Sequence, residues 1–472
     1  MTITAGARDA LRRLEAATRP MEPDREAALA RRWDELPAAV RTPTQMLGRR
    51  IAGCEGTHGV FPRCNLACSP CYHSRDANRV PVDGAHTILQ VEAQMGLLRE
   101  LRGPGQPAQL IGGEVSLLAP DDHAAALRAM LDAGRKPMSM THGDFDYDYL
   151  QALALDPRTG RPRLRHLSFE GHFDTTMIGR RGAERPASEA ELDPYRRRFC
   201  AMFARLRAEH GVTSFLAHNM TVTPGNIGEV ADVVRRNRDL GFRLFSFQPA
   251  AYVGNPARWD GGYRAIDPDD VWRRIEEGAG ARLHHRALQY GDPRCNRTAY
   301  GGFAGERYWT MLDEDDPRDS AALTSFLAAY GGMDFGAPRP LVAVRLARGA
   351  LGHPAVARRC AGAGVRVLRR MGGPLAVIRH RPRPVTFVMH SFMDASVVTP
   401  AWEALERGEM SDEPEVRAAQ ERLSACSYAM AHPQDGRIVP ACAQHAVFDP
   451  EENRRLVHLL RGRAAPAPPG AE

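Results

Sequence analysis

Residues 64–71 read Cys-Asn-Leu-Ala-Cys-Ser-Pro-Cys, inside the longer run GCEGTHGVFPRCNLACSPCYHSRD at 53–76. Three thiols fall within eight residues, and no fourth cysteine follows at a matching distance. A structural zinc ion takes four closed ligands, usually as two separated pairs. A [4Fe–4S] cluster has four irons, so three cysteines leave one iron without a protein ligand and open to a substrate. The spacing therefore favours an iron–sulfur cluster, with zinc as the alternative.

Short apolar runs follow this loop and alternate with longer amphipathic stretches. We expect strands at 108–115, 136–143, 164–171, 213–223 and 243–251, and helices near 86–102, 121–134, 189–209, 226–240 and from 267. Strands that alternate with helices of this length are typical of βαβ units and a parallel sheet, either open or closed into a barrel. With a strand leading into the cysteine loop there are about six βα units, fewer than the eight of a complete barrel.

The motif IGGEV at 111–115 comes at a predicted strand end, about forty residues after the cysteines. The two motifs together make the chain resemble the radical S-adenosylmethionine (radical SAM) enzymes over about residues 52–260. In that superfamily a Cys-x3-Cys-x2-Cys loop holds a [4Fe–4S] cluster, and a Gly-Gly-Glu-Pro motif at the second strand end holds the amino group of the methionine moiety. The resemblance implies the cluster ligands Cys64, Cys68 and Cys71 and the cofactor-binding residues Gly112, Gly113 and Glu114. Val115 stands where proline is usual.

Further positions follow from the same resemblance. MTHG at 140–143 stands where the family often has Thr-Asn-Gly, and LSFEGHFDTTMIGRRG at 167–182 resembles its fourth-strand region. The candidate contacts to the ribose or the methionine carboxylate are Ser168 and Glu170, with Arg180 or Arg181 at the later arginine position. The alternative for each is a strand-end cap or a surface ion pair.

The adenine contact departs from the family pattern. Many members place an aromatic residue just before the third cysteine, near the adenine, but this chain has Pro70 there. Tyr72 follows the third cysteine and is the candidate for this contact.

The resemblance implies a partial (βα)6 parallel barrel with an irregular C-terminal auxiliary domain. It also implies an enzyme that cleaves SAM reductively to a 5′-deoxyadenosyl radical, which abstracts hydrogen from an unactivated carbon. C–C bond formation or group transfer on a lipid or small molecule would follow, with flavodoxin or ferredoxin as the reductant. The alternatives are a maturase of a ribosomal peptide and a non-catalytic metal-binding or nucleic-acid-binding module. A maturase would be expected to carry a peptide-binding winged helix near the N-terminus, and residues 1–48 are too short and too helical for one.

Six cysteines lie outside the loop. Cys200 and Cys360 stand in helical patterns and are interpreted as small buried hydrophobic residues. The other four stand in Gly-, Pro- or polar-rich loops, and their number matches one fully ligated auxiliary [4Fe–4S] cluster. These four are Cys54, Cys295, Cys426 and Cys442. Inert loop thiols and a zinc site are the alternatives.

The C-terminal region carries a second, shorter resemblance. SFMDASVV at 391–398 and CSYAMAHPQDGRIVPAC at 426–442 resemble the tetraether lipid synthase branch and related methylases of the superfamily. His390, Asp394 and His445 lie in these motifs, where a site role and a hydrogen-bonded structural role are both open.

We expect four segments along the chain. They are a helical extension (1–48), the partial barrel (49–285), a C-terminal domain with a possible auxiliary cluster (286–462) and a disordered Pro/Ala tail (463–472).

Charge and composition narrow the function further. The net charge is +6, but the arginines are scattered, which argues against a nucleic-acid partner. The densest stretch, at 366–384, is interpreted as a solvated face, with an anion-binding role as the alternative. No apolar run reaches the length of a membrane span and no signal peptide is recognisable, so we expect a cytoplasmic protein. Nine cysteines in a reducing compartment favour metal binding or catalysis over disulfides.

Overall fold

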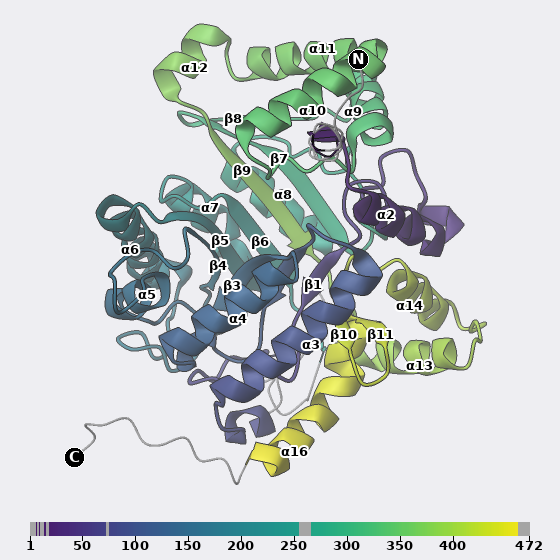
Figure 1. Ribbon diagram of the computed structural model, residues 1–472. Helices are drawn as coiled ribbons and strands as arrows, with labels where there is room; N and C mark the ends of the chain where they lie inside the picture. The colour runs from purple at the N-terminus through teal and green to yellow at the C-terminus, as the bar shows by residue number, and fades with distance from the viewer. Residues whose placement is uncertain are drawn as a thin grey trace.

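The computed structural model describes residues 18–71, 75–253 and 266–460, together with positions 6, 9, 14 and 15. Its centre is one curled sheet of eleven strands in the order β11-β10-β1-β2-β3-β4-β5-β6-β9-β7-β8 (Figure 1). The first six strands are neighbours in chain order and are all parallel. They are β1 (Cys54–Gly56), β2 (Pro107–Leu110), β3 (Lys136–Thr141), β4 (His166–His172), β5 (Thr213–Val222) and β6 (Leu244–Pro249). The predicted α/β class with a parallel sheet is confirmed.

Helices connect these strands and cover the outer side of the curled sheet. They are α3 (Gly84–Arg102), α4 (Pro120–Asp132), α5 (Tyr147–Ala154), α6 (Asp193–His210), α7 (Val230–Asn237) and α8 (Pro268–Ala279). Local signals set several of the ends. The Asp83 carboxylate accepts a hydrogen bond from the backbone N–H of His86 at the start of α3, and Gly103, at φ +67°, ends that helix. None of the helices expected from the apolar pattern corresponds to α5.

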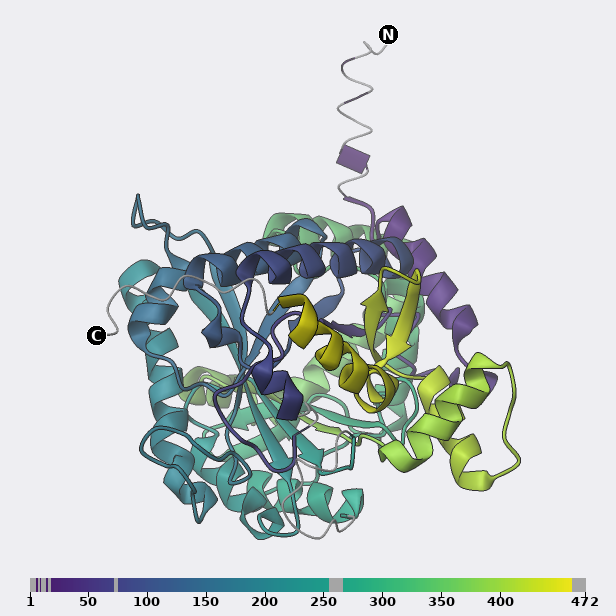
Figure 2. The same cartoon turned by 90° about the horizontal axis from the view of Figure 1, so that it is seen from below.

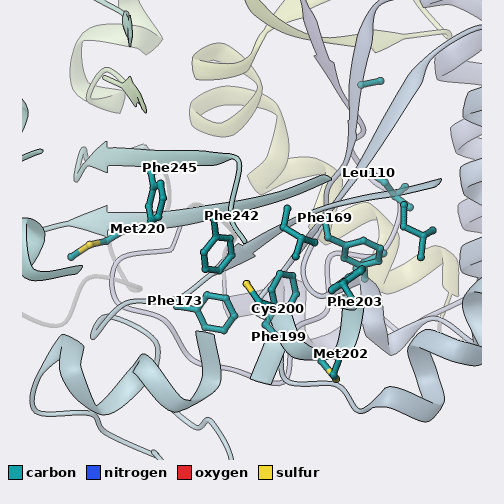
Figure 3. Close-up of a cluster of buried hydrophobic side chains, with 14 of the residues drawn as sticks. Leu110, Phe169, Phe173, Phe199, Cys200, Met202, Phe203, Met220, Phe242 and Phe245 are labelled. Carbon is teal, nitrogen blue, oxygen red and sulfur yellow. The ribbon is translucent and has the colours of Figure 1, made fainter. Parts of the chain in front are cut away.

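The main hydrophobic core lies between the strands and these helices. It includes a group of packed aromatic rings, with Phe169 from β4 and Phe203 from α6 at a ring separation of 5.1 Å. Cys200 lies in the same cluster and is 6% exposed (Figure 3). Its predicted role as a small buried hydrophobic residue is confirmed. Cys360 is partly exposed, because its helix packs only lightly, so the prediction of burial was wrong there.

The C-terminal half of the chain adds strands to both edges of the sheet. At one edge β9 (Arg383–His390) pairs parallel with β6, and β7 (Asn296–Ala304) and β8 (Arg307–Thr310) continue antiparallel. At the other edge β10 (Tyr428–His432) pairs parallel with β1, and β11 (Arg437–Pro440) is antiparallel to it. The predicted domain boundary at 285/286 therefore falls within one continuous sheet, and the segments 1–48, 49–285 and 286–462 stay a prediction.

The remaining helices surround this sheet. They are α2 (Pro23–Glu35), α9 (Pro317–Tyr330), α10 (Arg339–Gly352), α11 (Pro354–Arg370), α12 (Pro374–His380), α13 (Ala395–Glu406), α14 (Pro414–Ser424), α15 (Ala441–Ala443) and α16 (Asp449–Leu460). Figures 1 and 2 show the C-terminal α16 beside the segment that precedes α3, far from α11 and α12. The predicted tail at 463–472 lies outside the described residues.

Candidate functional site

The cysteine loop and the Gly-Gly-Glu motif lie side by side. The backbone N–H of Gly113 donates to the carbonyl of Phe61 (2.7 Å), and that of Glu114 donates to the carbonyl of Arg63 (2.9 Å). A Cβ atom at Gly113 would lie 2.1 Å from the Arg63 carbonyl oxygen, closer than any real contact. The absence of a side chain therefore lets the end of β2 pack directly on the residue that precedes Cys64.

The other side of the cysteine loop is bonded to the segment after β4. Backbone N–H groups of Ala67 and Ser69 donate to the carbonyls of Ile178 (2.8 Å) and Thr176 (2.9 Å). Within the loop, the N–H of Leu66 donates to the sulfur of Cys64 at 3.3 Å. The loop that carries the three thiols is thus held between two parts of the partial barrel.

Glu114 ties the ends of β2 and β3 together. One carboxylate oxygen accepts hydrogen bonds from the Thr141 hydroxyl (2.7 Å) and the Ser116 N–H (2.9 Å), and the other accepts from the His142 N–H (2.8 Å). The His142 ring then meets the Asn65 side chain of the cysteine loop at 2.7 Å. The MTHG stretch is therefore part of the same hydrogen-bonded unit.

Arg180 is a fully buried cation beside this loop. One of its terminal nitrogens donates to the carbonyl of His142 (2.8 Å), but its Nε and Nη1 have no hydrogen-bond partner among the described residues. Burial lowers the pKa of the Arg180 guanidinium, while the negative charges of Asp144 and Cys68 oppose that shift. Of the two arginines left open by the sequence, Arg181 is exposed and Arg180 faces inward.

The two β4 candidates occupy different surroundings. Glu170 is 5% exposed, and burial raises the pKa of its carboxyl to about 7 against the opposing effect of His172. Ser168 lies two residues nearer the start of the strand, with its hydroxyl 3.3 Å from the exposed His166 ring. Parallel α/β folds bind ligands at the carboxyl ends of their strands. Glu170 lies nearer that end of β4 than Ser168 does and is therefore the better placed of the two candidates. Tyr72, the candidate for the adenine contact, lies outside the described residues.

The four loop cysteines converge although they are far apart in the chain. Cys54 begins β1, Cys295 precedes β7, Cys426 precedes β10 and Cys442 follows β11. An ionised Cys426 would raise the pKa of each of the other three thiols, and an ionised Cys295 would raise the pKa of Cys442, so the four side chains lie near one another. Burial raises the pKa of the thiols of Cys54, to about 12, and Cys295, to about 11. We call Cys54, Cys295, Cys426 and Cys442 the four-thiol site.

Arginine side chains place positive charge beside the four-thiol site. The Nε of Arg422, on α14, donates to the sulfur of Cys295 at 3.2 Å, and its Nη2 donates to the Ser391 carbonyl. Burial raises the pKa of the Cys426 thiol and the positive charges of Arg32 and Arg102 oppose that shift, while Arg32 also donates to the Cys426 carbonyl (2.8 Å). Cationic groups at this distance stabilise thiolates and anionic clusters.

The sulfur spacing bears on the choice of metal. Tetrahedral zinc would bring thiolate sulfurs to about 3.8 Å from one another. Across residues 18–71, 75–253 and 266–460, no three cysteine sulfurs all lie within 4.8 Å of each other. Among these residues, therefore, no trio of thiols is already as close as zinc ligands would be.

Two cavities flank the four-thiol site. One of about 340 Å³ lies at the ends of β6 and β9, with Ala250, Phe392 and Met393 among its apolar lining and Arg422 at its wall. The other, of about 440 Å³, reaches Cys426 directly. The first cavity has a mixed lining suited to an organic substrate with an apolar part.

The C-terminal candidates have hydrogen-bonded positions. The ring of His390 contacts the Asn296 side chain at 2.5 Å, and burial lowers the pKa of His390 to about 4. Asp394 accepts from the Tyr252 N–H at 2.6 Å, and His445 pairs with Asp449 at 2.7 Å.

Sequence reasoning missed a histidine and carboxylate network around α16. His58 bonds Glu452 at 2.9 Å and stacks on His432 at 4.2 Å, and His432 contacts the Gln444 side chain. It also missed Arg422. His58 and Glu452, like Arg422 and its partner Cys295, stand more than one hundred residues apart, and no local spacing in the sequence marks such a pair.

Comparisons with known proteins are sparse. No model of a protein family matches the chain, and no curated protein matches it. Similar solved structures include a polyhistidine-tagged anSMEcpe with bound AdoMet (12% identity, TM-score 0.31) and "Native anSMEcpe with bound AdoMet" (14% identity, TM-score 0.31). A third is "Native anSMEcpe with bound AdoMet and Cp18Cys peptide" (12% identity, TM-score 0.30). Each match covers 47% of this chain and 57% of the other, so the chain spans little more than half the length of those structures. TM-scores of this size decide neither fold nor function.

None of the helices in the described part of the chain combines the length and the apolar character that a bilayer crossing requires.

Proposed function

We propose that this chain is a radical SAM enzyme. One observation carries the proposal: the cysteine loop is bonded on one side to Gly113 and Glu114 and on the other to the segment that leads into the buried Arg180. Three thiols, a strand-end glycine pair and a buried cation therefore lie in one region that hydrogen bonds hold together. These groups suit an iron–sulfur cluster with an open iron and a ligand that carries an amino and a carboxylate group.

Each group of residues has a binding role that its chemistry suggests. Cys64, Cys68 and Cys71 would hold a [4Fe–4S] cluster, and the β2 end at Gly112 would receive the amino group of SAM. When bound and reduced, the cluster supplies the electron that splits the C5′–S bond of SAM into methionine and a 5′-deoxyadenosyl radical. Arg180 would pair with the methionine carboxylate through its Nε and Nη1, which no described residue bonds.

The four-thiol site would hold a second [4Fe–4S] cluster. Four cysteines match its ligand number, and the Arg422 donor at Cys295 and the nearby Arg32 and Arg102 compensate its negative charge. Flavodoxin or ferredoxin would supply electrons, in a reducing compartment such as the cytoplasm.

The substrate we propose is a lipid or another small molecule with an unactivated carbon, which undergoes C–C bond formation or group transfer after hydrogen abstraction. The partly apolar cavity at the ends of β6 and β9 supports this class. A ribosomal peptide is the alternative substrate class, and the deuterium-transfer experiment described below distinguishes the two.

The test is anaerobic reconstitution with iron and sulfide, followed by iron counting and a 5′-deoxyadenosine assay with SAM and a strong reductant. We expect about eight irons per chain for the wild type and about four for a Cys64→Ala/Cys68→Ala/Cys71→Ala variant, with deoxyadenosine only from the wild type. A Cys54→Ala/Cys295→Ala/Cys426→Ala/Cys442→Ala variant should also hold about four irons. Cys200→Ala is the matched control and should keep the full count.

Zinc in place of iron, with no deoxyadenosine, would overturn the enzyme proposal in favour of a binding module. The substrate class is tested separately by carrying out the reaction in deuterated water and with deuterated candidate substrates. Deuterium transfer into 5′-deoxyadenosine from a lipid supports the proposed class, and transfer from a peptide instead overturns it.

A further inference from the structure

The helices α10, α11 and α12 form a peripheral layer with an unusual surface (Figure 1). No residue of α11 or α12 is buried. Of the thirteen exposed large hydrophobic side chains of the described residues, seven lie between Phe335 and Ile378. The three most exposed are Leu351 (85%), Leu375 (82%) and Ile378 (74%). Leu375 and Ile378 are three residues apart on α12 and so share one helix face.

The same stretch contains basic side chains but no acidic ones. Between Asp334 and Asp394 the chain has eleven arginines and no acidic residue. Arg366 and Arg370 fasten α11 to α9 through Asp319, at 2.6 Å each. The side chains of five others make no ion pair or hydrogen bond to any described residue, namely Arg339, Arg358, Arg369, Arg379 and Arg381. All five are exposed.

We propose that the α10–α12 layer is a docking surface for an anionic lipid bilayer. Leu351 and the Leu375/Ile378 pair stand at the two ends of α11, a helix about 25 Å long. Aliphatic side chains at these points would enter the boundary between headgroups and acyl chains, and the five arginines would lie at the phosphate level. Each arginine near such a surface contributes roughly a fivefold gain in affinity.

The other occupants fit the surface less well. A nucleic acid would satisfy the arginines but has no place for protruding leucine and isoleucine side chains. A second copy of the chain on the same face would bring arginine against arginine, with no acidic group between Asp334 and Asp394 to compensate. This inference does not depend on the iron–sulfur chemistry, so each can fail while the other stands.

The test is vesicle flotation with the full chain, comparing vesicles of phosphatidylcholine alone with vesicles that contain phosphatidylglycerol as well. We expect binding only to the anionic vesicles and loss of binding at high ionic strength. Leu375→Ser/Ile378→Ser and Arg369→Gln/Arg379→Gln should each weaken binding by about tenfold or more. Leu89→Ser, at the 62% exposed Leu89 of α3, is the matched control and should bind as the wild type does.

Three outcomes would overturn the proposal. They are no binding to anionic vesicles, unchanged binding of the Leu375→Ser/Ile378→Ser variant, and arginine-dependent binding of a DNA duplex without vesicle binding. Sedimentation velocity tests a fourth outcome. A dimer that the Leu375→Ser/Ile378→Ser variant no longer forms would assign the face to a second copy of the chain. All the substituted side chains are exposed, so melting temperatures should stay at the wild-type value and exclude misfolding as the cause.

Discussion

Glu114 is the residue whose structural role is clearest at the site. Its carboxylate accepts three hydrogen bonds, from Ser116, Thr141 and His142, and so joins the ends of two strands beneath the cysteine loop. The carboxylate is fully buried, so water could not take its place as the acceptor for these three donors. A change of this one side chain therefore affects both the stability of the sheet end and the position of the loop.

We predict that Glu114→Ala lowers the free energy of unfolding by about 3 kcal/mol, because it leaves buried donors unpaired. Urea denaturation of the metal-free protein measures this change. Glu403→Ala, at an exposed position of α13, is the control and should change the free energy by less than about 0.5 kcal/mol. Equal effects of the two substitutions would contradict the role of Glu114.

Glu170 predicts a pH dependence of stability. Burial raises the pKa of its carboxyl from an ordinary value near 4.5 to about 7, so the folded state binds this proton more tightly than the unfolded state does. The contribution of Glu170 to stability therefore falls as the pH rises between these two values, by up to about 3 kcal/mol. Glu170→Gln should raise the unfolding midpoint at pH above about 7 and leave it nearly unchanged below about 4.5.

Urea titrations of the metal-free protein across this pH range provide the measurement. The exposed Glu306→Gln serves as the control, with no expected pH-dependent difference from the wild type. Parallel curves for wild type and Glu170→Gln at every pH would show that the carboxyl ionises freely.

Among the elements, the end of β2 controls the cysteine loop. The backbone of Gly113 packs on Arg63 without room for a Cβ atom. Gly113→Ala would therefore push the loop away from the strand, and we expect it to lose most of the iron bound at Cys64, Cys68 and Cys71. Gly96→Ala, on α3 with nothing within 4 Å of the added Cβ, should keep the iron and gain about 0.5 to 1 kcal/mol of stability. Iron retention by Gly113→Ala would contradict this packing argument.

Helix α14 brings Arg422 to the four-thiol site, where it donates to Cys295. Loss of a cationic donor at a cluster ligand disfavours the more negative reduced state. We predict that Arg422→Gln makes the reduction potential of the second cluster more negative, as measured by redox titration with electron paramagnetic resonance. Arg417→Gln on the exposed side of the same helix is the control. An unchanged potential with a full iron count would show that Arg422 has only a packing role.

On the scale of the whole molecule, the sheet joins the two halves of the chain. β9 pairs with β6 and β10 pairs with β1, so the C-terminal strands cover both edges of the first six. The N-terminal helix α2 is tied to the same unit, since Arg32 donates to the Cys426 carbonyl and Arg25 to the Pro104 carbonyl. Uncovered parallel edges would expose unpaired backbone groups.

We therefore predict a single cooperative unfolding transition for the full chain and no stable fold for a chain cut after residue 285. Calorimetry, with far-ultraviolet and tryptophan signals followed in parallel, measures the first, and the solubility and circular dichroism of the shortened chain measure the second. Two separate transitions, or a folded shortened chain, would instead support independent domains at the predicted boundary.

Features that depend on local spacing follow from the order of the amino acids alone. The alternation of apolar runs predicted β3 to β6 and the helices α3, α4, α6, α7 and α8 to within about four residues, because side-chain periodicity and helix-ending residues act over short distances. It also predicted β2, which ends at Leu110, five residues before the expected end. The spacing of the three loop cysteines also predicted convergence on one centre, a role that the iron count tests. α5 was missed, since its eight residues carry too short a periodic pattern.

Which distant residues meet depends on how the elements pack in three dimensions. The order of strands at the two sheet edges places Cys54 near Cys426 and Arg422 on Cys295, and nothing in the local sequence encodes these pairs. Local sequence also does not show that the Glu114 carboxylate accepts a hydrogen bond from the His142 N–H at the end of β3. Nor does it show that Arg180 is buried while its neighbour Arg181 is exposed. Such contacts depend on the packing of whole elements, in which burial and hydrogen-bond satisfaction are collective properties of residues far apart in the chain.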